Sequence, residues 1–528
     1  MKEVDAVVVG AGFGGLYMIH KLRELGFSVQ GFERGDDVGG TWYWNRYPGA
    51  RCDVESLDYS FSFDPQLEQE WEWTERFATQ PEIERYLVHV ADRYDLRPSI
   101  RFGTTVERAK WSDEARRWHV ETDKGEAVDA RFLILATGSL SAAKAPDIEG
   151  VDSFKGEVVQ TSSWHEGISY AGKNVGVIGT GSTGIQAIPM IAREAASLTV
   201  FQRTPTFTVP ARNAPLSKEA IDSHKARYPE LREGARQTYA GWFPVRTGKK
   251  AAELSPEELE SAYEEAWRRG GPGISSTVED MMVDTEANES LAEFFRRKIR
   301  ETVKDPERAS GLIPTGFPIG SKRLAVDTDY YETFNLPNVH LKDLRKTPLK
   351  RIVPEGVETS DGVTPVDMLV LATGFDAITG SFLRIDIDNG EGLTLRRKWE
   401  AGPLTYLGLM SEGFPNLFFI AGPGSPSVLS NMVVSIEQHV EWIADCLVDL
   451  KRRGVDRIEA TQEAEEKWVK RCNDSAAGTL FMSGQSWYLG ANVPGKPRVF
   501  MPFIGGVGNY RRICDKVKAD DYAGFALN

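Results

Sequence analysis

A chain of 528 residues is too long for one hydrophobic core, so its length predicts roughly two to four domains. Its hydrophobic, charged and aromatic fractions of 41%, 27% and 10% are typical of a folded globular protein and exclude intrinsic disorder. The net charge of −14 argues against non-specific binding to nucleic acid or to an anionic membrane surface.

The four cysteines include no closely spaced pair, which argues against a disulfide framework and against a CxxC metal or redox site. They favour a reducing cytoplasm as the location. The apolar run over residues 6–19 is interrupted by glycines and follows two acidic residues, so it is typical of a strand and a turn rather than of a signal sequence. No uncharged stretch approaches the roughly 20 apolar residues that span a bilayer, and no membrane association is predicted.

The first expected element is a buried parallel strand over residues 4–9 that enters a glycine turn directly. Gly10, Gly12 and Gly15 permit a tight turn, let backbone N–H groups approach a pyrophosphate, and let the following helix pack closely on the strand. The next strand ends at Glu33, whose carboxylate can accept hydrogen bonds from a ribose without a 2′-phosphate. This pattern indicates an FAD or NAD site.

A second glycine turn, over residues 179–184, follows a strand over 174–178 and precedes a helix. The strand after that helix, over 197–201, ends before Arg203 instead of before an acidic residue. A guanidinium at this position can pair with a 2′-phosphate, which favours NADPH over NADH. One glycine motif alone is weak, but two in matching contexts predict two different dinucleotides.

A chain that holds both FAD and NADPH can move a hydride from one to the other, with the flavin supplying the chemistry. Disulfide reductases share this layout, but they need a redox-active cysteine pair, which the sequence lacks. The expected electron acceptor is therefore oxygen or a soluble molecule.

The stretch 215–320 has helical patterns and lacks strand patterns. One clear helix start combines Ser255 as N-cap with Pro256 at the first helical position. We therefore predict an α/β fold with two Rossmann-like dinucleotide-binding domains and a helical insertion. The expected ranges are 1–140 and 377–528 for the FAD domain, 141–214 and 321–376 for the NADPH domain, and 215–320 for the insertion.

Several further segments resemble the type I Baeyer-Villiger monooxygenase family. The stretch 39–53 fills every defining position of the family's N-terminal signature, and 372–376 is similar to its return strand into the flavin domain. The stretch 154–165 resembles the family fingerprint but departs from it at Gln160, where the family has histidine, and at His165. The resemblance covers nearly the whole chain and looks closest to the phenylacetone and steroid monooxygenases.

The resemblance implies a reaction in which NADPH reduces FAD, O₂ forms a flavin peroxyanion, and this anion attacks a ketone to give an ester or lactone. It places a permanently cationic side chain, Arg323, beside the flavin and Asp53 as the carboxylate that positions it. Without the resemblance, Arg323 would be taken for a surface arginine and Asp53 equally for a helix cap. Two other functions remain open: oxygenation of sulfur or nitrogen, and a cofactor sensor or NADPH oxidase without an organic product.

Several other residues receive no catalytic role. Gln160 is expected either to alter the coupling between the two nucleotide domains or to change nothing. Trp42, Trp44 and Trp164 are expected to be core aromatic residues. None of the histidines, His439 among them, has metal-ligand spacing, so they are expected to be structural and no metal is predicted. The sequence is compatible with aryl, cyclic, steroid-like and long aliphatic ketones as substrates. It is also compatible with a monomeric protein.

The resemblance also assigns binding residues. The residues expected to contact FAD or NADPH are Gly10, Gly12, Phe13, Gly15, Glu33, Gly40, Thr41, Trp42, Asp53, Gly179, Thr180, Gly181, Ser182, Thr183, Gly184, Arg203, Thr204, Lys322, Ala372, Thr373, Gly374, Trp487 and Asn492, and those expected in the ketone pocket are Ser427, Val428 and Leu429.

Overall fold

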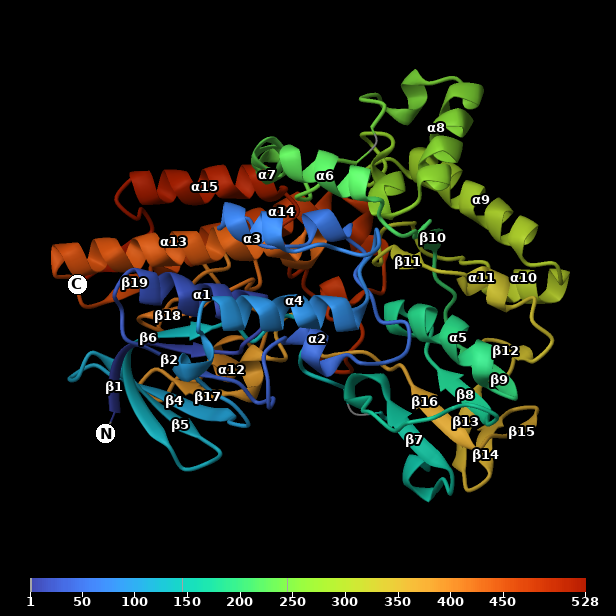
Figure 1. Cartoon of the computed structure of the whole chain (residues 1–528), viewed down its shortest axis with the longest axis horizontal. Coiled ribbons are helices and arrows are strands. Elements are labelled where there is room, and N and C mark those ends of the chain that lie inside the picture. Colours follow the sequence, from blue (N-terminus) through green and yellow to red (C-terminus); the bar gives the residue numbers. More distant parts are fainter. Residues whose placement is uncertain (1, 145, 245) are drawn as a thin grey trace.

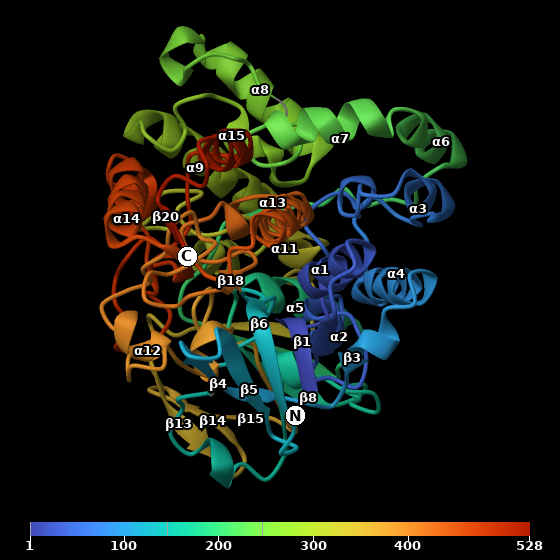
Figure 2. The ribbon, with the colours of Figure 1, turned by 90° about the vertical axis from the view of Figure 1, so that its left-hand side faces the viewer.

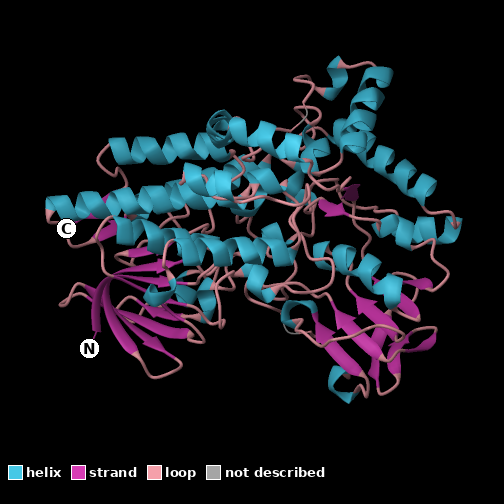
Figure 3. Ribbon diagram, in the orientation of Figure 1, coloured by secondary structure: helices cyan, strands magenta, loops and turns pink. Residues whose placement is uncertain are grey.

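The computed structural model describes residues 2–144, 146–244 and 246–528. Two β-sheets lie at opposite ends of the molecule, and a broad layer of helices runs along one side of both (Figures 1 and 3). The predicted α/β class, with two Rossmann-like units and a helical insertion, is confirmed.

The first sheet has eight strands in the order β17-β4-β5-β6-β1-β2-β3, with β18 beside β6. The strand predicted over 4–9 is β1, which pairs in parallel with β2 and β6 as a buried strand of a doubly wound sheet does. The eight strands are β1 (Lys2–Val9), β2 (Val29–Phe32), β3 (Ile100–Arg101), β4 (Val106–Ser112), β5 (Arg117–Thr122), β6 (Ala127–Leu135), β17 (Asp386–Asp388) and β18 (Leu417–Phe419).

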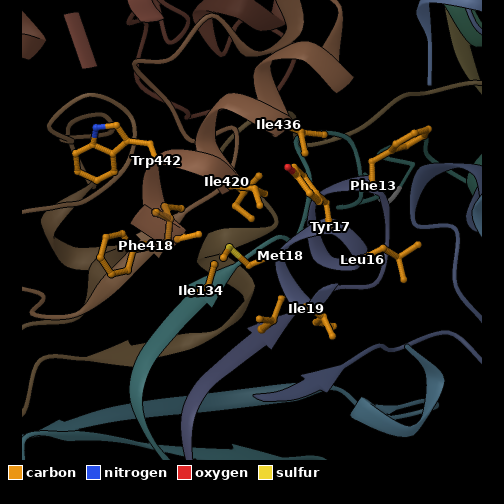
Figure 4. Close-up of a cluster of buried hydrophobic side chains, with 14 of the residues drawn as sticks. Phe13, Leu16, Tyr17, Met18, Ile19, Ile134, Phe418, Ile420, Ile436 and Trp442 are labelled. Atoms are coloured by element: carbon orange, nitrogen blue, oxygen red, sulfur yellow. The ribbon is translucent and has the colours of Figure 1, made fainter. Parts of the chain in front are cut away.

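Helices α1 (Phe13–Glu24) and α13 (Met432–Arg453) pack together over this sheet. Their apolar side chains meet those of β6, of β18 and of the residue after β18 in one buried cluster, as Figure 4 shows. Members of the cluster include Met18, Ile134, Phe418, Ile420 and Trp442. This packing fixes the start of α1, and with it the first glycine turn, against the ends of the strands.

The second sheet has five strands, all parallel, in the order β12-β9-β8-β16-β7. The strand predicted over 174–178 is β8, and the strand that leads to Arg203 is β9. Helix α5 (Ser182–Glu194) follows β8 across the second glycine turn. The strands are β7 (Glu157–Gln160), β8 (Asn174–Ile178), β9 (Ser197–Gln202), β12 (Val339–Asp343) and β16 (Met368–Leu371).

Between β9 and β12 the chain forms helices that rise above the sheets, at the top of Figure 2. The predicted helix start at Ser255 is confirmed, since Ser255 and Glu258 form a reciprocal capping box at the start of α8. The helices of this region are α6 (Lys218–Ala226), α7 (Tyr228–Gln237), α8 (Pro256–Arg269), α9 (Thr285–Thr302) and α10 (Pro306–Leu312).

Helix α7 joins this region to the N-terminal part of the chain through a buried ion pair. Arg232 Nε donates to Glu68 Oε1 at 2.8 Å, and both side chains are less than one-tenth exposed. The same guanidinium donates to the backbone oxygen of Asp58 and to Ser60 Oγ. Among the described residues, no helix is both long and apolar enough to cross a membrane.

Shorter elements complete the chain. These are α2 (Thr41–Trp44), α3 (Pro65–Glu70), α4 (Gln80–Arg93), α11 (Tyr330–Thr333), α12 (Leu395–Lys398), α14 (Gln462–Ala477), α15 (Val507–Ala519), β10 (Thr208–Pro210), β11 (Ala325–Asp327), β13 (Leu349–Val353), β14 (Gly356–Thr359), β15 (Gly362–Pro365), β19 (Ile458–Ala460) and β20 (Phe525–Leu527).

Candidate active site

The first glycine turn connects β1 to α1 in a conformation that requires its glycines. Gly10 has a φ of +106°, and a Cβ on Gly15 would lie 1.8 Å from the carbonyl oxygen of Gly10. The backbone of Gly12 lies directly against that of Gly40, where a Cβ would come within 2.8 Å of the Gly12 Cα. Two glycine segments thus form one side-chain-free surface at the N-terminus of α1, which suits a pyrophosphate.

Glu33 lies at the end of β2, next to this turn, and only 6% of it is exposed. Its carboxylate accepts hydrogen bonds from the backbone N–H groups of Ala11 and Gly35, both at 2.8 Å. Burial raises the pKa of Glu33, and these two N–H groups counter part of that rise. A buried carboxylate held at the edge of a glycine turn fits the ribose of an adenosine.

The other residues expected near FAD surround the same turn. Phe13 begins α1 and packs edge-on against Tyr59, while Thr41 is exposed at the start of α2. Trp42 is 8% exposed, belongs to the core and donates from Nε1 to Tyr59 Oη at 3.3 Å. Trp42 therefore has a packing role in addition to any contact with a cofactor.

The second glycine turn repeats the first. Gly179 has a φ of +111°, and a Cβ on Gly184 would lie 2.2 Å from the Gly179 carbonyl oxygen. A Cβ on Gly181 would meet no atom within 4 Å, so this position borders open space at the start of α5. Thr180 Oγ1 donates to the Thr204 carbonyl at 3.1 Å and joins the turn to the end of β9, while Ser182 and Thr183 form the first turn of α5.

Two cations lie together beside this second turn. Arg203 is exposed, and Lys322 Nζ lies 4.1 Å from the ring centre of Phe317. Burial, and then the nearby charge of Arg203, lower the pKa of Lys322. Neither cation forms an ion pair within the described residues. Two neighbouring positive charges without a carboxylate fit a phosphate monoester, as on the ribose of NADPH.

The structure brings Arg323 and Asp53 together from 270 positions apart in the sequence. The guanidinium donates two parallel hydrogen bonds to the carboxylate, from Nε at 2.9 Å and from Nη2 at 2.7 Å. Burial by itself would lower the pKa of Arg323, but the charge of Asp53, its hydrogen bonds to the guanidinium and the neighbouring Tyr488 and Cys52 together raise it, so the side chain stays cationic. Arg323 is therefore not a free surface arginine, and Asp53 does not cap a helix.

The third donor of Arg323 connects this pair to the predicted ketone pocket. Nη1 donates to the carbonyl oxygen of Val428 at 2.9 Å. Val428 lies in a short 3₁₀ turn, Ser427–Leu429, that begins with Ser427 at a φ of +43°. Ser427 and Val428 are buried and Leu429 is half-buried, so this turn forms a wall beside the guanidinium.

Tyr488 is a neighbour of Arg323 that the sequence analysis missed. Its side chain is 3% exposed, and its pKa is raised by burial while the charge of Arg323 opposes this rise. It belongs to the same apolar cluster as Val428. In the sequence, Tyr488 could have been noticed only as the residue that directly follows Trp487; in the structure the two ring centres are 4.5 Å apart.

The late segment around Asn492 lies over the end of β16. Asn492 Nδ2 donates to the Phe375 carbonyl at 2.7 Å, and the carbonyl of Asn492 accepts from Lys144 Nζ at 3.0 Å. The side-chain oxygen of Asn492 is buried and has no hydrogen-bond partner among the described residues. Trp487 is half-buried in the neighbouring turn.

The end of β16 abuts the second glycine turn. A Cβ on Gly179 would lie 2.4 Å from the carbonyl oxygen of Ala372, and Thr373 and Gly374 continue from there with Gly374 at a φ of +79°. The first turn has the same relation to Ala136, because a Cβ on Gly10 would lie 2.5 Å from its carbonyl oxygen.

A second contact missed by the sequence analysis joins the loop before Asp53 to helix α5, which starts at the second glycine turn. Gln186 of α5 accepts a hydrogen bond from Tyr47 Oη at 2.8 Å and donates one to the Arg51 carbonyl at 3.0 Å. A Cβ on Gly49 would lie 2.4 Å from the Gln186 carbonyl oxygen, so the approach is close. The loop that ends at Asp53 is thus seated on the helix that starts at the second glycine turn.

Comparison with known proteins also finds nucleotide-dependent oxidoreductases. Residues 4–235 match the family model described as pyridine nucleotide-disulphide oxidoreductase. A Baeyer-Villiger monooxygenase of Pseudooceanicola batsensis is 42% identical over 524 residues, which cover 98% of this chain and 95% of that protein.

Two solved structures match over almost their whole length. An oxidised steroid monooxygenase bound to NADP is 50% identical with a TM-score of 0.96, covering 100% of this chain and 99% of that one. A structure of OTEMO in complex with FAD and NADP is 42% identical with a TM-score of 0.96, covering 99% of each chain. The four cysteines of the present chain are buried, and no two of them are closely spaced in the sequence, unlike the redox-active cysteine pair of disulphide reductases.

Proposed function

We propose that Arg323 and Asp53 form the reaction centre of this chain, which belongs to the Baeyer-Villiger monooxygenase family. It is an FAD-dependent monooxygenase that uses NADPH and O₂ to convert ketones to esters or lactones. The observation that carries this proposal is the bidentate pair with its third hydrogen bond to Val428. The guanidinium is held by the protein on two sides and is therefore fixed in position.

FAD, when bound and reduced, supplies the oxygen-activating chemistry. Arg323 contributes a positive charge that persists at every working pH, because a guanidinium does not lose its proton. That charge stabilises negative charge that develops on oxygen as the ketone carbonyl is attacked. Asp53 orients the guanidinium and offsets the cost of burying it.

We propose that Arg203 and Lys322 hold the 2′-phosphate of NADPH, with the pyrophosphate on the turn from Gly179 to Gly184. The absence of an ion-pair partner for either cation within the described residues supports this role. The open space beside Gly181 supports the position of the pyrophosphate. The Ala372–Gly374 segment would border this site.

FAD would occupy the first turn, on the surface that Gly12 and Gly40 form together, with its ribose at Glu33. The support is the side-chain-free contact between the two glycines and the buried carboxylate beside it. We further propose that Trp487 and Asn492 close over the nicotinamide, since Asn492 has a buried oxygen without a partner among the described residues. Such a closure would shield the reacting groups from water.

The ketone would lie against the Ser427–Leu429 turn.

The chain would divide into an FAD domain over 1–140 and 377–528, an NADPH domain over 141–214 and 321–376, and a helical insertion over 215–320. The two sheets support this division: β17 and β18 return to the first sheet, and β12 and β16 return to the second. A cytoplasmic location is part of the proposal, supported by four buried, unpaired cysteines.

The proposal is tested by replacing Arg323 with alanine. We expect NADPH to reduce the bound FAD at nearly the normal rate, because that step does not use Arg323. Ester formation should fall by about 100-fold or more, as on loss of a donor to a developing oxyanion. NADPH oxidation, ester mass and released peroxide would be measured with a panel of cyclic, aryl, steroid and long aliphatic ketones.

Arg452→Ala serves as the matched control, because Arg452 is a well-exposed arginine that pairs with Asp449, three residues before it. It should leave every rate unchanged. If Arg323→Ala formed ester at the normal rate, the assignment of the reaction centre would be wrong.

A further inference from the structure

A fully buried polar pair lies outside the reaction centre, between α13 and α15. His439 of α13 is 0% exposed and Tyr510 of α15 is 2% exposed. The Ala421 N–H donates to His439 Nδ1 at 2.8 Å, so Nδ1 is the acceptor and the ring proton lies on Nε2. Nε2 then donates to Tyr510 Oη at 2.9 Å, and Tyr510 donates to the Leu407 carbonyl.

The direction of this relay is fixed because His439 stays neutral. Burial, assisted by the nearby charge of Arg511, lowers the pKa of His439 to about 3. The ring therefore accepts at one nitrogen and donates at the other throughout the working pH range, and it links the backbones of Ala421 and Leu407.

Both ends of the relay are strained backbone positions. Ala421 has a φ of +56° and Leu407 a φ of +58°, a region that residues with side chains rarely adopt. The two turns touch, since a Cβ on Gly422 would lie 2.4 Å from the Gly408 carbonyl oxygen. Strained residues persist only where their surroundings hold them, and the relay supplies a hydrogen bond at each.

The turn held at Ala421 leads directly to the wall of the ketone pocket. Figure 4 shows Ile420, the preceding residue, packed among side chains of α1 and α13. After Ala421 the chain runs to Ser427, whose Oγ lies 3.5 Å from the Ala421 carbonyl oxygen, and then to Val428, whose carbonyl accepts from Arg323. The anchored turn is thus seven residues before the carbonyl that holds the guanidinium.

We propose that His439 is a positioning residue for ketone oxygenation: by holding Ala421 in the left-handed conformation, it fixes the Ser427–Leu429 turn against Arg323 and the ketone. This inference rests on the proposed function, because the turn matters only if Arg323 is the reaction centre. Within the part of the chain that the structure describes, His439 forms hydrogen bonds with Ala421 and Tyr510 and none with Arg323, so the proposed effect runs through the turn.

Four variants test the inference. His439→Leu removes both ring hydrogen bonds, and Tyr510→Phe breaks the relay with a smaller change in shape. His439→Asn retains an oxygen near the position of Nδ1 that can accept from Ala421. Trp442→Phe is the matched control, because Trp442 is also buried in α13 but its ring N–H donates to the Cys514 carbonyl of α15, at 3.0 Å, instead of joining the relay.

Three quantities would be measured on the FAD-loaded enzyme with cyclohexanone as the ketone: the rate of FAD reduction by NADPH, the ester formed per NADPH consumed, and amide hydrogen exchange of residues 417–431. We expect His439→Leu and Tyr510→Phe to keep FAD reduction within about twofold. Their ester yield should fall on the order of tenfold, because small misplacements of a reacting geometry cost this much or more. Exchange in 417–431 should rise in both.

His439→Asn should restore most of the yield, and Trp442→Phe should lower only the melting temperature. If His439→Leu gave the yield and exchange of the Trp442→Phe control, the inference would be overturned. If His439→Leu fails to fold, Tyr510→Phe is judged by the same criterion. Normal ester formation by Arg323→Ala would instead overturn the proposed function, whatever the His439 variants show.

Discussion

At the scale of single residues, the charges at the two sites differ in how the protein holds them. Arg323 is paired with Asp53, whereas Arg203 and Lys322 lie side by side without a carboxylate among the described residues. A paired cation is suited to stay in place during a reaction. An unpaired cation pair is suited to bind an anionic ligand and release it.

Arg203→Ala is therefore expected to raise the KM for NADPH by about tenfold or more, the equivalent of about 1.4 kcal/mol for one lost phosphate contact. The KM for NADH should change little, because NADH carries no 2′-phosphate. Steady-state kinetics with both nucleotides check this. Arg193→Ala is the control, since Arg193 lies on α5 and pairs with Asp329. An equal rise for both nucleotides would remove Arg203 from the phosphate site.

The residue scale is also where prediction from the sequence alone was weakest. Arg323 and Asp53 are 270 positions apart, and nothing in their spacing shows that they meet. Only the resemblance to a family suggested the pair. The contacts of Tyr488, Gln186 and His439 join segments that are far apart in the sequence, so they depend on packing that the local sequence does not encode.

At the scale of elements, local sequence patterns were sufficient to predict the strands, turns and helix starts that form the two nucleotide sites and the insertion. The strands β1 and β8, the glycine turns after them and the cap at Ser255 were all predictable, because each depends on neighbouring residues. The glycines within one turn are nonetheless required for different reasons. A Cβ on Gly184 would collide with the backbone of Gly179, whereas a Cβ on Gly181 would point into open space.

This difference predicts opposite outcomes for two alanine variants. Gly184→Ala should lower the melting temperature strongly, because the added Cβ would lie 2.2 Å from the Gly179 carbonyl oxygen. Gly181→Ala should keep the melting temperature but raise the KM for NADPH about tenfold, because the methyl group would occupy the space proposed for the pyrophosphate. Thermal unfolding and kinetics separate the two effects. A Gly181→Ala enzyme with normal NADPH binding would contradict the proposed pyrophosphate position.

At the scale of the whole molecule, the helical insertion is fastened to the N-terminal part by the buried pair of Arg232 and Glu68. A buried pair adds little net stability, but the loss of one partner leaves an uncompensated charge. The pair therefore matters most for the placement of the insertion over the loop that carries Asp58 and Ser60.

Arg232→Met should destabilise the protein by about 3–5 kcal/mol, because Glu68 would remain buried and unpaired. The double variant Arg232→Met with Glu68→Leu should recover much of this loss. Melting temperatures and limited proteolysis of the insertion would be compared. Arg227→Met, at an exposed pair with Glu230, should change neither. A double variant no more stable than the single one would mean that the ion pair is not what the mutation disturbs.

The contact of Gln186 with Tyr47 and Arg51 has a consequence for protein engineering. Asp53 follows Arg51 by two positions, so the carboxylate that pairs with Arg323 belongs to a loop that is held by α5. A chimera that takes this helix from a homologue but keeps the native loop would combine contact surfaces that do not match. The loop that carries Asp53 could then shift relative to Arg323. Crossover points should therefore exchange residues 47–53 and α5 as one block.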